Sequence, residues 1–255
     1  MIKVSVIIPT WNRADMVVRA IKSALKQTLP VFEVLVCDDG STDNTYQAVK
    51  LIKDKRVRWL PEEHTGLPAV VRNRGIKKSR GKWLAFLDSD DEWLPQKLER
   101  QFNFVDKNEY LAVCSNAFKI TSKNKDVSKY FEHNKKELSF KDLLKTNYVI
   151  CSSVIIRKSL LSKCIGFSET INLQASEDYA FWLRIATQTK FSYLKKALVN
   201  YSDEPDKSIR RLTKDPKLQK KSVLQDFLLW SLKNNISFKY LSKALLCYIK
   251  TSINK

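Results

Sequence analysis

Short apolar segments that alternate with helical patterns constrain the fold of this chain more than any other feature. Three segments, VSVIIPT, FEVLVC and KWLAFLD, are largely apolar and rich in β-branched residues. Such runs are typical of strands that are buried on both faces of a parallel sheet. The segments between them, RADMVVRAIKSALKQT, residues 45–52 and GLPAVVRNRGIKKS, have helical spacing, and RVRWL adds a short strand. This alternation predicts an α/β, doubly wound sheet over residues 1–100.

Acidic residues follow two of these predicted strands. Asp38 and Asp39 close one strand, and Asp88 and Asp90 follow another. In such sheets ligands bind beyond the carboxyl ends of the strands, where both groups are expected. A buried carboxylate is unfavourable unless it is hydrogen-bonded or holds a cation. The pattern therefore indicates a cation site, although turn formation by DDGSTD and the preference of helix starts for acidic residues would also account for it.

The second half of the chain has less regular patterns. We expect a helix over residues 95–105, strands near 110–115 and 154–157, a helix at SEDYAFWLRIATQ, and strands at KFSYLK and ALVNYS. The polar segment TSKNKDVSKYFEHNKKE is predicted to be a surface excursion. The length of 255 residues suits one large domain, or one domain with an extension.

The charge of the chain favours polyanionic partners. Forty-six Lys and Arg residues stand against 27 Asp and Glu, a net charge of +19. The lysines are spread broadly and no nucleic-acid-binding motif is present, so we expect no nucleic acid partner. From Lys207 onward, twelve basic residues face only Asp215 and Asp226 and are interleaved with apolar residues. This basic helical extension would pack on its own domain, dock on an anionic membrane or form an oligomer contact.

Cysteine usage and hydropathy bear on the compartment. The five cysteines are odd in number and show no C-x-x-C spacing, which indicates free thiols in a reducing compartment. The N-terminal apolar run is too short for a signal peptide, and no segment is long enough for a transmembrane helix. We therefore expect a cytoplasmic protein, placed at the inner face of the cell membrane if the extension binds lipid.

Five motifs occur together and in order: VSVIIPTWNR, VLVCDDGSTDNT, GLPAVVRNRG, WLAFLDSDDEWLPQKL and SEDYAFWLR. With them the sequence resembles the family 2 glycosyltransferases, inverting enzymes that depend on nucleotide sugars. The resemblance extends from Val4 to Arg184 and implies the GT-A fold, a Rossmann-like, mixed and mostly parallel sheet flanked by helices. On this basis we expect a GT-A domain over residues 1–205, with a nucleotide-binding half (1–100) and an acceptor-binding half (101–205). The basic helical extension then covers residues 206–255.

The resemblance also implies which residues bind the donor. Thr10, Trp11 and Asn12 would cradle the nucleotide base at the end of the first strand, and Asp39 would accept a hydrogen bond from the uracil N–H. Arg72, in VRNRG, would approach the nucleotide or its diphosphate, since a guanidinium suits bidentate phosphate contact.

A metal site is implied at the D-x-D motif. Asp88 would face the ribose and a metal-bound water, and Asp90 would ligate Mn²⁺ or Mg²⁺ directly. Such ions combine one or two carboxylates with diphosphate oxygens. Asp91 would be a third contributor or a helix cap.

Glu177 and Asp178 resemble the acidic pair that carries the chemistry in this family. Asp178 would be the general base that deprotonates the acceptor hydroxyl, and Glu177 would contact the donor sugar or orient the loop. Partial desolvation would raise the pKa of such an aspartate and make it a stronger base. A capping box that begins at Ser176 is an alternative explanation, and it does not exclude the catalytic one.

The resemblance therefore implies inverting, metal-dependent transfer of a sugar from a UDP-sugar to an acceptor hydroxyl. The acceptor would be a saccharide or a lipid-linked saccharide in cell-envelope or capsular polysaccharide biosynthesis. The alternatives are a catalytically inactive nucleotide-sugar-binding relative and a nucleic-acid-binding protein. A nucleotidyltransferase is disfavoured because PTWNRAD contains no glycine-rich phosphate loop. Whether Arg210 or Arg211 closes over the diphosphate is left open.

Overall fold

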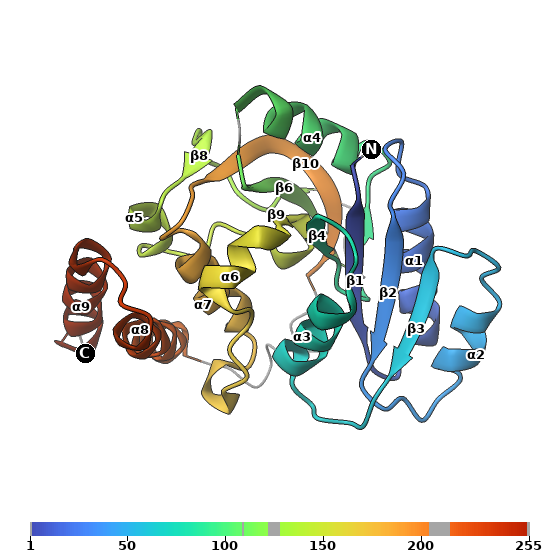
Figure 1. The fold of residues 1–255 in the computed structure, drawn as a ribbon, viewed down its shortest axis with the longest axis horizontal. Coiled ribbons are helices and arrows are strands. Elements are labelled where there is room, and N and C mark those ends of the chain that lie inside the picture. The colour runs from blue at the N-terminus through green and yellow to red at the C-terminus, as the bar shows by residue number, and fades with distance from the viewer. Residues whose placement is uncertain (1, 109, 122–127, 204–214, 254–255) are drawn as a thin grey trace.

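The computed structural model describes residues 2–108, 110–121, 128–203 and 215–253. Its N-terminal part alternates strands and helices as the sequence predicts (Figure 1). The elements are β1 (Val4–Thr10), α1 (Ala14–Leu25), β2 (Glu33–Asp38), α2 (Thr45–Lys50), β3 (Val57–Pro61), α3 (Pro68–Lys78) and β4 (Trp83–Phe86). The predicted α/β class is therefore confirmed for this part of the chain.

Parallel strands form the N-terminal half of the sheet. β1 pairs in parallel with β2 and with β4, and β2 pairs in parallel with β3. The register sets Thr10 beside Asp38 and Ile7 beside Phe86, so the carboxyl ends of β1, β2 and β4 lie at one edge. The acidic residues that follow β2 and β4 meet at this edge, where open α/β sheets bind ligands.

The second half of the chain extends the same sheet beyond β4 with both parallel and antiparallel pairs. β9 is antiparallel to both β4 and β6, β6 is parallel to β10, and β5 is antiparallel to β10. The elements here are β5 (Glu92–Trp93), α4 (Lys97–Asn108), β6 (Ala112–Ile120), β7 (Ser128–Lys129), β8 (Glu137–Leu138), α5 (Phe140–Leu143), η1 (Cys151–Ser153), β9 (Ile155–Arg157), η2 (Lys158–Leu160), α6 (Leu161–Cys164), η3 (Ile171–Leu173), α7 (Glu177–Ile185) and β10 (Phe191–Ser202). The sheet is therefore mixed, as expected.

One long strand, β10, replaces the two short strands that the sequence predicted at KFSYLK and ALVNYS. Its pairing with β6 shifts register between Leu194 and Ala197, and the intervening Lys195 and Lys196 are exposed. A bulge of this kind accommodates extra residues without ending the strand. The two lysines therefore interrupt the apolar pattern but leave the strand continuous.

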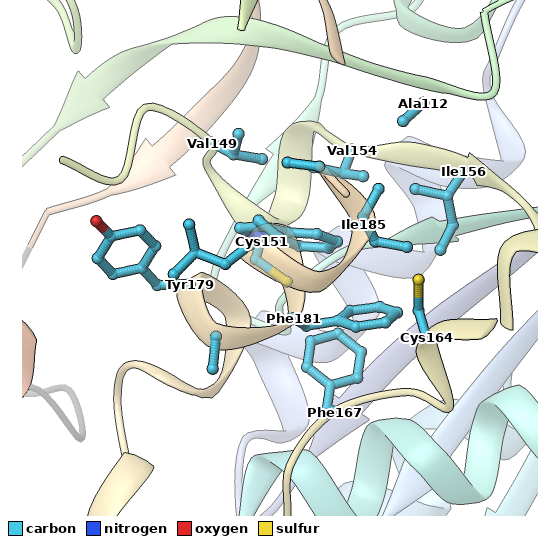
Figure 2. Packing of buried hydrophobic residues seen from close by; sticks show 14 of the residues in the cluster. Ala112, Val149, Cys151, Val154, Ile156, Cys164, Phe167, Tyr179, Phe181 and Ile185 are labelled. Atoms are coloured by element: carbon cyan, nitrogen blue, oxygen red, sulfur yellow. The ribbon is translucent and has the colours of Figure 1, made fainter. Parts of the chain in front are cut away.

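Apolar side chains cover both faces of the sheet. In β1, Val6 and Ile8 pack in the cluster that contains α1, whereas Ile7 packs in the cluster that contains α3 and α7. Successive strand residues point to opposite faces, so one strand contributes to two cores. In the second cluster Phe167 and Phe181 lie together with ring centroids 4.6 Å apart (Figure 2). All five cysteines are free thiols, as predicted, and four of them are buried.

The C-terminal extension is helical, with α8 (Pro216–Lys233) and α9 (Phe238–Ile253). In Figure 1 the two helices lie at one end of the molecule, on the side of α7 and far from α1 and α2. Leu224 and Phe227 of α8 are buried in the same apolar cluster as α7. Arg184 of α7 also forms an ion pair with Asp226 of α8 at 2.6 Å. In the described ranges, no helix has the length and apolar character needed to cross a bilayer.

Candidate active site

A cavity of about 600 Å³ opens at the carboxyl ends of β1, β2 and β4. Its wall comes from both halves of the chain: the N-terminal strand ends and α3 form one part, and the start of α7, the end of β10 and the segment after β7 form another. The sequence-predicted site residues along the wall are Thr10, Trp11, Asp39, Arg72, Asp88, Asp90, Glu177 and Asp178. Asn12 lies beside the cavity and not in its lining.

Two carboxylates of the D-x-D motif face this cavity. Asp88 accepts a hydrogen bond from Arg72 Nη2 at 2.7 Å, and its own backbone N–H donates to Ser152 Oγ at 3.0 Å. Asp90 accepts from Arg13 Nη1 at 2.8 Å. Burial raises the pKa of Asp90, and the nearby Asp88 charge adds to this rise while Arg13 opposes it. The turn after β4 thus holds two anionic groups together at the cavity.

Asp91 points away from the cavity, into the sheet. Its side chain is buried and accepts a hydrogen bond from the backbone N–H of Ser202 in β10 at 2.8 Å. Burial, followed by the charges of Asp90 and Asp88, raises the pKa of Asp91 well above its usual range. In this structure Asp91 ties the motif to β10 and lies outside the lining of the cavity.

The acidic pair at the start of α7 reaches the cavity from the other half of the chain. Glu177 is buried and accepts a hydrogen bond from Arg72 Nη1 at 2.6 Å. Ser176 makes no side-chain cap, since its hydroxyl donates to the carbonyl of Leu173. The capping-box alternative is therefore not formed here. Arg72 joins the D-x-D motif to α7, because it binds Asp88 with one nitrogen and Glu177 with the other.

Asp178 has the electrostatic surroundings of a base that works near neutral pH. Burial, followed by the charge of Glu177, raises the pKa of Asp178 to about 7, while Arg72 opposes the rise. Its carboxylate also accepts a hydrogen bond from the backbone N–H of Tyr179 at 2.6 Å. A carboxylate with such a pKa takes up a proton far more readily than an ordinary aspartate.

The opposite wall carries the residues predicted to bind the nucleotide. Trp11 is 48% exposed and stacks on His64, with ring centroids 4.5 Å apart. Asp39 is buried and accepts from the backbone N–H groups of Thr65 and Gly66. Asn12 has a positive φ of 50°, and its side-chain oxygen accepts from Thr42 N–H at 2.8 Å. Asn12 therefore braces the loop after β2, and Asp39 holds the loop before α3.

The wall also contains residues that no sequence motif indicates. Arg13 pairs with Asp90 across 77 residues of chain, a contact that no local pattern reveals. His64 has no partner nearby in the sequence, yet its ring stacks on Trp11. Tyr130 and Phe131 belong to the segment predicted as a surface excursion, but they line the cavity and their rings contact each other. The two adjacent aromatic residues in KYFEH were the available signal.

His133, in the polar segment TSKNKDVSKYFEHNKKE, does not line the cavity. His133 packs among Phe131, Tyr148 and Tyr193. Arg210 and Arg211, and residues 122–127 of the polar segment, lie outside the described residues.

The oxygen ligands at the cavity fit a hard divalent ion that shares its shell with a substrate. Asp88 and Asp90 supply carboxylate oxygens, the ligand type that Mg²⁺ and Mn²⁺ prefer. Within the described ranges, no cluster of three or more His, Cys, Asp and Glu side chains is arranged to hold a metal by itself. An ion at this place would therefore need further oxygens from substrate or water, as is usual for Mg²⁺.

Comparison with protein families gives a direct match. The family model described as "Glycosyl transferase family 2" matches residues 5–165. The enzyme UDP-Glc:alpha-D-GlcNAc-diphosphoundecaprenol beta-1,3-glucosyltransferase WfgD of Escherichia coli is 35% identical over 189 residues, covering 74% of this chain and 72% of that protein. The putative teichuronic acid biosynthesis glycosyltransferase TuaG of Bacillus subtilis (strain 168) is 30% identical over 200 residues, covering 78% and 74%.

Some relatives are much longer than this chain. An uncharacterized glycosyltransferase of Rickettsia felis is 36% identical over 201 residues, which are 77% of this chain and 32% of that protein. The chain thus spans about a third of the length of this relative.

Solved structures show the same fold. TarS of S. aureus in complex with UDP-GlcNAc superposes with a TM-score of 0.79 at 23% identity, over 98% of this chain and 72% of that one. The mannosyltransferase PcManGT of Pyrobaculum calidifontis, in complex with GDP-Man and Mn²⁺, gives a TM-score of 0.66 at 16% identity, over 98% and 70%. The predicted GT-A fold is therefore confirmed. The sequence motifs of this chain, the matched family model and the similar proteins agree: the chain belongs to glycosyl transferase family 2.

Proposed function

We propose that this chain transfers a sugar from a UDP-sugar to an acceptor hydroxyl, with inversion at the anomeric carbon. The contact made by Arg72 carries the proposal. It holds Asp88 of the D-x-D motif and Glu177 of the acidic pair at 2.7 and 2.6 Å, although 89 residues separate these two motif positions. Asp88, Glu177 and the neighbouring Asp178 therefore lie around one cavity, which supports the roles proposed for them. The names of WfgD, which uses UDP-Glc, and of the TarS complex with UDP-GlcNAc support UDP as the nucleotide.

The chemistry needs a single displacement and a single base. Asp178 takes the proton of the acceptor hydroxyl as its oxygen bonds to the anomeric carbon, and the bond from that carbon to the diphosphate oxygen breaks. Because no covalent sugar–enzyme intermediate forms, the configuration inverts. Glu177 contacts the donor sugar or holds the loop, and its buried pairing with Arg72 fixes its place.

Asp88 and Asp90 are the residues that would hold Mn²⁺ or Mg²⁺. When bound, the ion supplies positive charge that offsets the diphosphate and stabilises the UDP leaving group. Arg13 forms an ion pair with Asp90 in the structure. If Asp90 binds the metal ion, the guanidinium of Arg13 becomes available to the phosphates. Arg72 contributes a second guanidinium at the phosphate side of the cavity.

The nucleoside would lie against the wall built from β1 and β2. Trp11, stacked on His64, presents an exposed aromatic face to a base. Thr10 and Asn12 shape the end of β1. In this proposal the carboxylate of Asp39 accepts a hydrogen bond from the uracil N–H.

The acceptor would be a saccharide or a lipid-linked saccharide of a cell-envelope or capsular polysaccharide. Support comes from the names of WfgD and TuaG, which refer to a diphosphoundecaprenol-linked sugar and to teichuronic acid. It also comes from an exposed apolar face on α9, formed by Phe238, Leu245, Leu246, Ile249 and Ile253. We assign this face to contact with an anionic membrane at its cytoplasmic surface.

Helical spacing sets these five α9 residues on one side of the helix, and Lys239 and Lys243 lie along one edge of this side. Apolar residues bordered by lysines are typical of helices that lie in the interface of an anionic bilayer. We propose that α9 contacts the membrane with this exposed face. α8 then anchors α9 to the catalytic domain over residues 1–205.

A panel of UDP- and GDP-sugars with Mn²⁺ tests the donor. We expect one UDP-sugar to support nucleotide release that a chelator abolishes, and we expect UDP with Mn²⁺ to raise the melting temperature. If no nucleotide raises the melting temperature and every donor stays intact, the chain does not bind a nucleotide sugar.

Two variants separate binding from chemistry in the same assay. Asp178→Asn should keep UDP binding and lose transfer by a factor of about 10² to 10⁴, the usual contribution of a general base. Asp90→Ala should weaken the metal-dependent binding of UDP. Equal transfer by Asp178→Asn and the native chain would remove Asp178 from the role of base, and retained binding without transfer in the native chain would indicate an inactive relative.

A further inference from the structure

A second cavity, of about 660 Å³, adjoins the candidate active site. It lies between the start of α7 and the helices α8 and α9 of the C-terminal extension. Asn147, Ala175 and Asp178 line both cavities, so the proposed base is reached from either one. Ala175 has a positive φ of 65°, an unfavourable conformation for alanine that the surrounding packing imposes where the two cavities meet.

The two cavities differ sharply in charge. Apart from Asp178, the charged residues in the described lining of the second cavity are Lys145, Lys217, Lys220 and Lys250. We call these four residues the lysine set. The first cavity instead has Asp39, Asp88, Asp90, Glu177 and Asp178 against Arg13 and Arg72. A phosphate group in the first cavity therefore needs an added cation, whereas the lysine set attracts a phosphate group directly.

The helix α8, which carries Lys217 and Lys220, contacts both the segment after α5 and the helix α7. Lys220 Nζ donates to the backbone carbonyl of Lys145 at 3.0 Å, which joins α8 to the segment after α5. The ion pair between Arg184 and Asp226 fixes α8 against α7, the helix that begins with Glu177 and Asp178. The backbone of α8 and the side chain of Lys220 thus have fixed positions relative to Asp178, while Lys145, Lys217 and Lys250 are exposed at the rim of the cavity.

The orientation of α9 extends this arrangement to the protein surface. Cys247 and Thr251 of α9 line the second cavity, and Lys250 stands between that side and the exposed apolar face. An amphiphilic molecule with its apolar chain along α9 could therefore set an anionic group among the lysine set.

We propose that the lysine set binds the phosphate or diphosphate of a phosphorylated acceptor, whose sugar hydroxyl then meets Asp178 from the second cavity. This inference rests on the proposed function, since it assigns the acceptor side of that reaction. Asp178 gains the proton of the hydroxyl, the hydroxyl oxygen forms the new bond to the anomeric carbon, and the donor's diphosphate departs with the electron pair of the broken bond. The acceptor's own phosphates remain bonded and act only in binding.

The test uses geranyl diphosphate as the probe, with saturating UDP and Mg²⁺ present so that the first cavity is occupied. Binding is followed by calorimetric titration of the full chain, and geraniol serves as the uncharged control ligand. The test variant is Lys217→Gln with Lys250→Gln, two exposed residues of the lysine set. The matched control is Lys163→Gln with Lys233→Gln, two exposed lysines outside the cavity lining whose substitution removes the same charge.

We expect saturable binding of the diphosphate and none of geraniol. Loss of two charge-assisted contacts should weaken binding by the test variant about tenfold or more, while the control pair stays within about twofold. Equal losses in both pairs would show attraction to overall charge only, and absence of saturable binding by the native chain would also overturn the proposal. Probe binding that is seen only when UDP is left out would place the probe in the first cavity and have the same consequence.

Failure of this inference can be told apart from failure of the proposed function. The melting temperature rise caused by UDP should be the same in the native chain and in the Lys217→Gln, Lys250→Gln variant. If that rise is present but the probe does not distinguish the variants, the donor site stands and the lysine set is not the acceptor site. If UDP has no effect on any form of the protein, the donor site fails, and the comparison of the two lysine pairs still reports on the second cavity.

Discussion

At the scale of single residues, Arg13 and Arg72 hold most of the carboxylates at the first cavity. Arg13 binds Asp90, and Arg72 binds both Asp88 and Glu177. Breaking a buried ion pair by removal of one partner costs about 3–5 kcal/mol, because the remaining charge is left without compensation. The two arginines thus allow the chain to bring several acids together before any substrate arrives. Asp178, in contrast, receives no side-chain hydrogen bond from a cation in the described structure.

The raised pKa of Asp178 predicts a dependence of stability on pH. Its pKa is about 7 in the folded chain, whereas an unfolded aspartate has a pKa of about 3.9. Between these values the unfolded state releases the proton and the folded state keeps it, so ionisation of Asp178 makes the folded state less stable as pH rises. Asp178→Asn removes this penalty. The melting temperature of the variant, relative to the native chain, should therefore increase with pH.

The measurement is thermal unfolding in chelator and without nucleotide, at about pH 5.5 and about pH 8.5. The advantage of Asp178→Asn should grow by several degrees across this range, since 1 kcal/mol corresponds to roughly 2–4 °C in a chain of this size. Asp15→Asn, at an exposed position in the first turn of α1, should show no such growth. A pH-independent difference for Asp178→Asn would mean that its carboxylate is not desolvated as described.

At the scale of elements, α8 connects the C-terminal extension to the catalytic core. Leu224 is fully buried in the cluster that contains α7, whereas Leu229 on the same helix is 55% exposed. Leu224→Ala should lower the free energy of unfolding by about 2–5 kcal/mol, and Leu229→Ala by less than about 0.5 kcal/mol. Urea titration of both variants measures the difference. Similar small effects would mean that the extension unfolds apart from residues 1–205, and the predicted boundary at 205/206 would then separate two folding units.

Most elements follow from local sequence patterns, and the exceptions have physical causes. The strands and helices from β1 to β4 were predicted because apolar runs and helical spacing alternate there with short connections. β10 was wrongly divided, since a bulge at Lys195 and Lys196 looks in sequence like the end of a strand. The contribution of Tyr130 and Phe131 to the cavity was missed because a lysine-rich neighbourhood hides two aromatic residues.

The candidate site was predictable only where residue types form a known motif. The positions of Asp88, Asp90 and Asp178 were expected from the resemblance, and they lie around one cavity, while their roles stay predictions. The pair of Arg13 with Asp90 could not be predicted, because it joins the start of α1 to the turn after β4 through tertiary structure alone. The lysine set likewise comes from three separate elements of the chain.

At the scale of the whole molecule, the exposed apolar face of α9, the second cavity and Asp178 follow one another across the C-terminal side. The exposed face of α9 has no described partner within the chain that covers Phe238, Leu246 or Ile253, which are 77%, 59% and 70% exposed. Exposed apolar clusters of this kind mark interaction sites in soluble domains. With Lys239 and Lys243 beside it, the face is suited to an anionic bilayer, which would bring a lipid-linked acceptor to the opening beside Lys250.

Vesicle flotation tests this arrangement by comparing the same substitution, leucine to glutamine, on α9 and at a distant position. The native chain should bind vesicles rich in anionic lipid and should bind zwitterionic vesicles weakly, because each lysine near the surface adds about 1 kcal/mol. Leu246→Gln should weaken binding about tenfold, the effect of losing one leucine from an apolar environment. Leu51→Gln alters a leucine that is more exposed (77%) than Leu246, at the end of α2, far from α9 in Figure 1, and should leave binding unchanged. Equal losses from both substitutions, or equal binding to both kinds of vesicle, would remove the membrane from the proposed assembly and leave the lysine set to recognise a phosphorylated acceptor in solution.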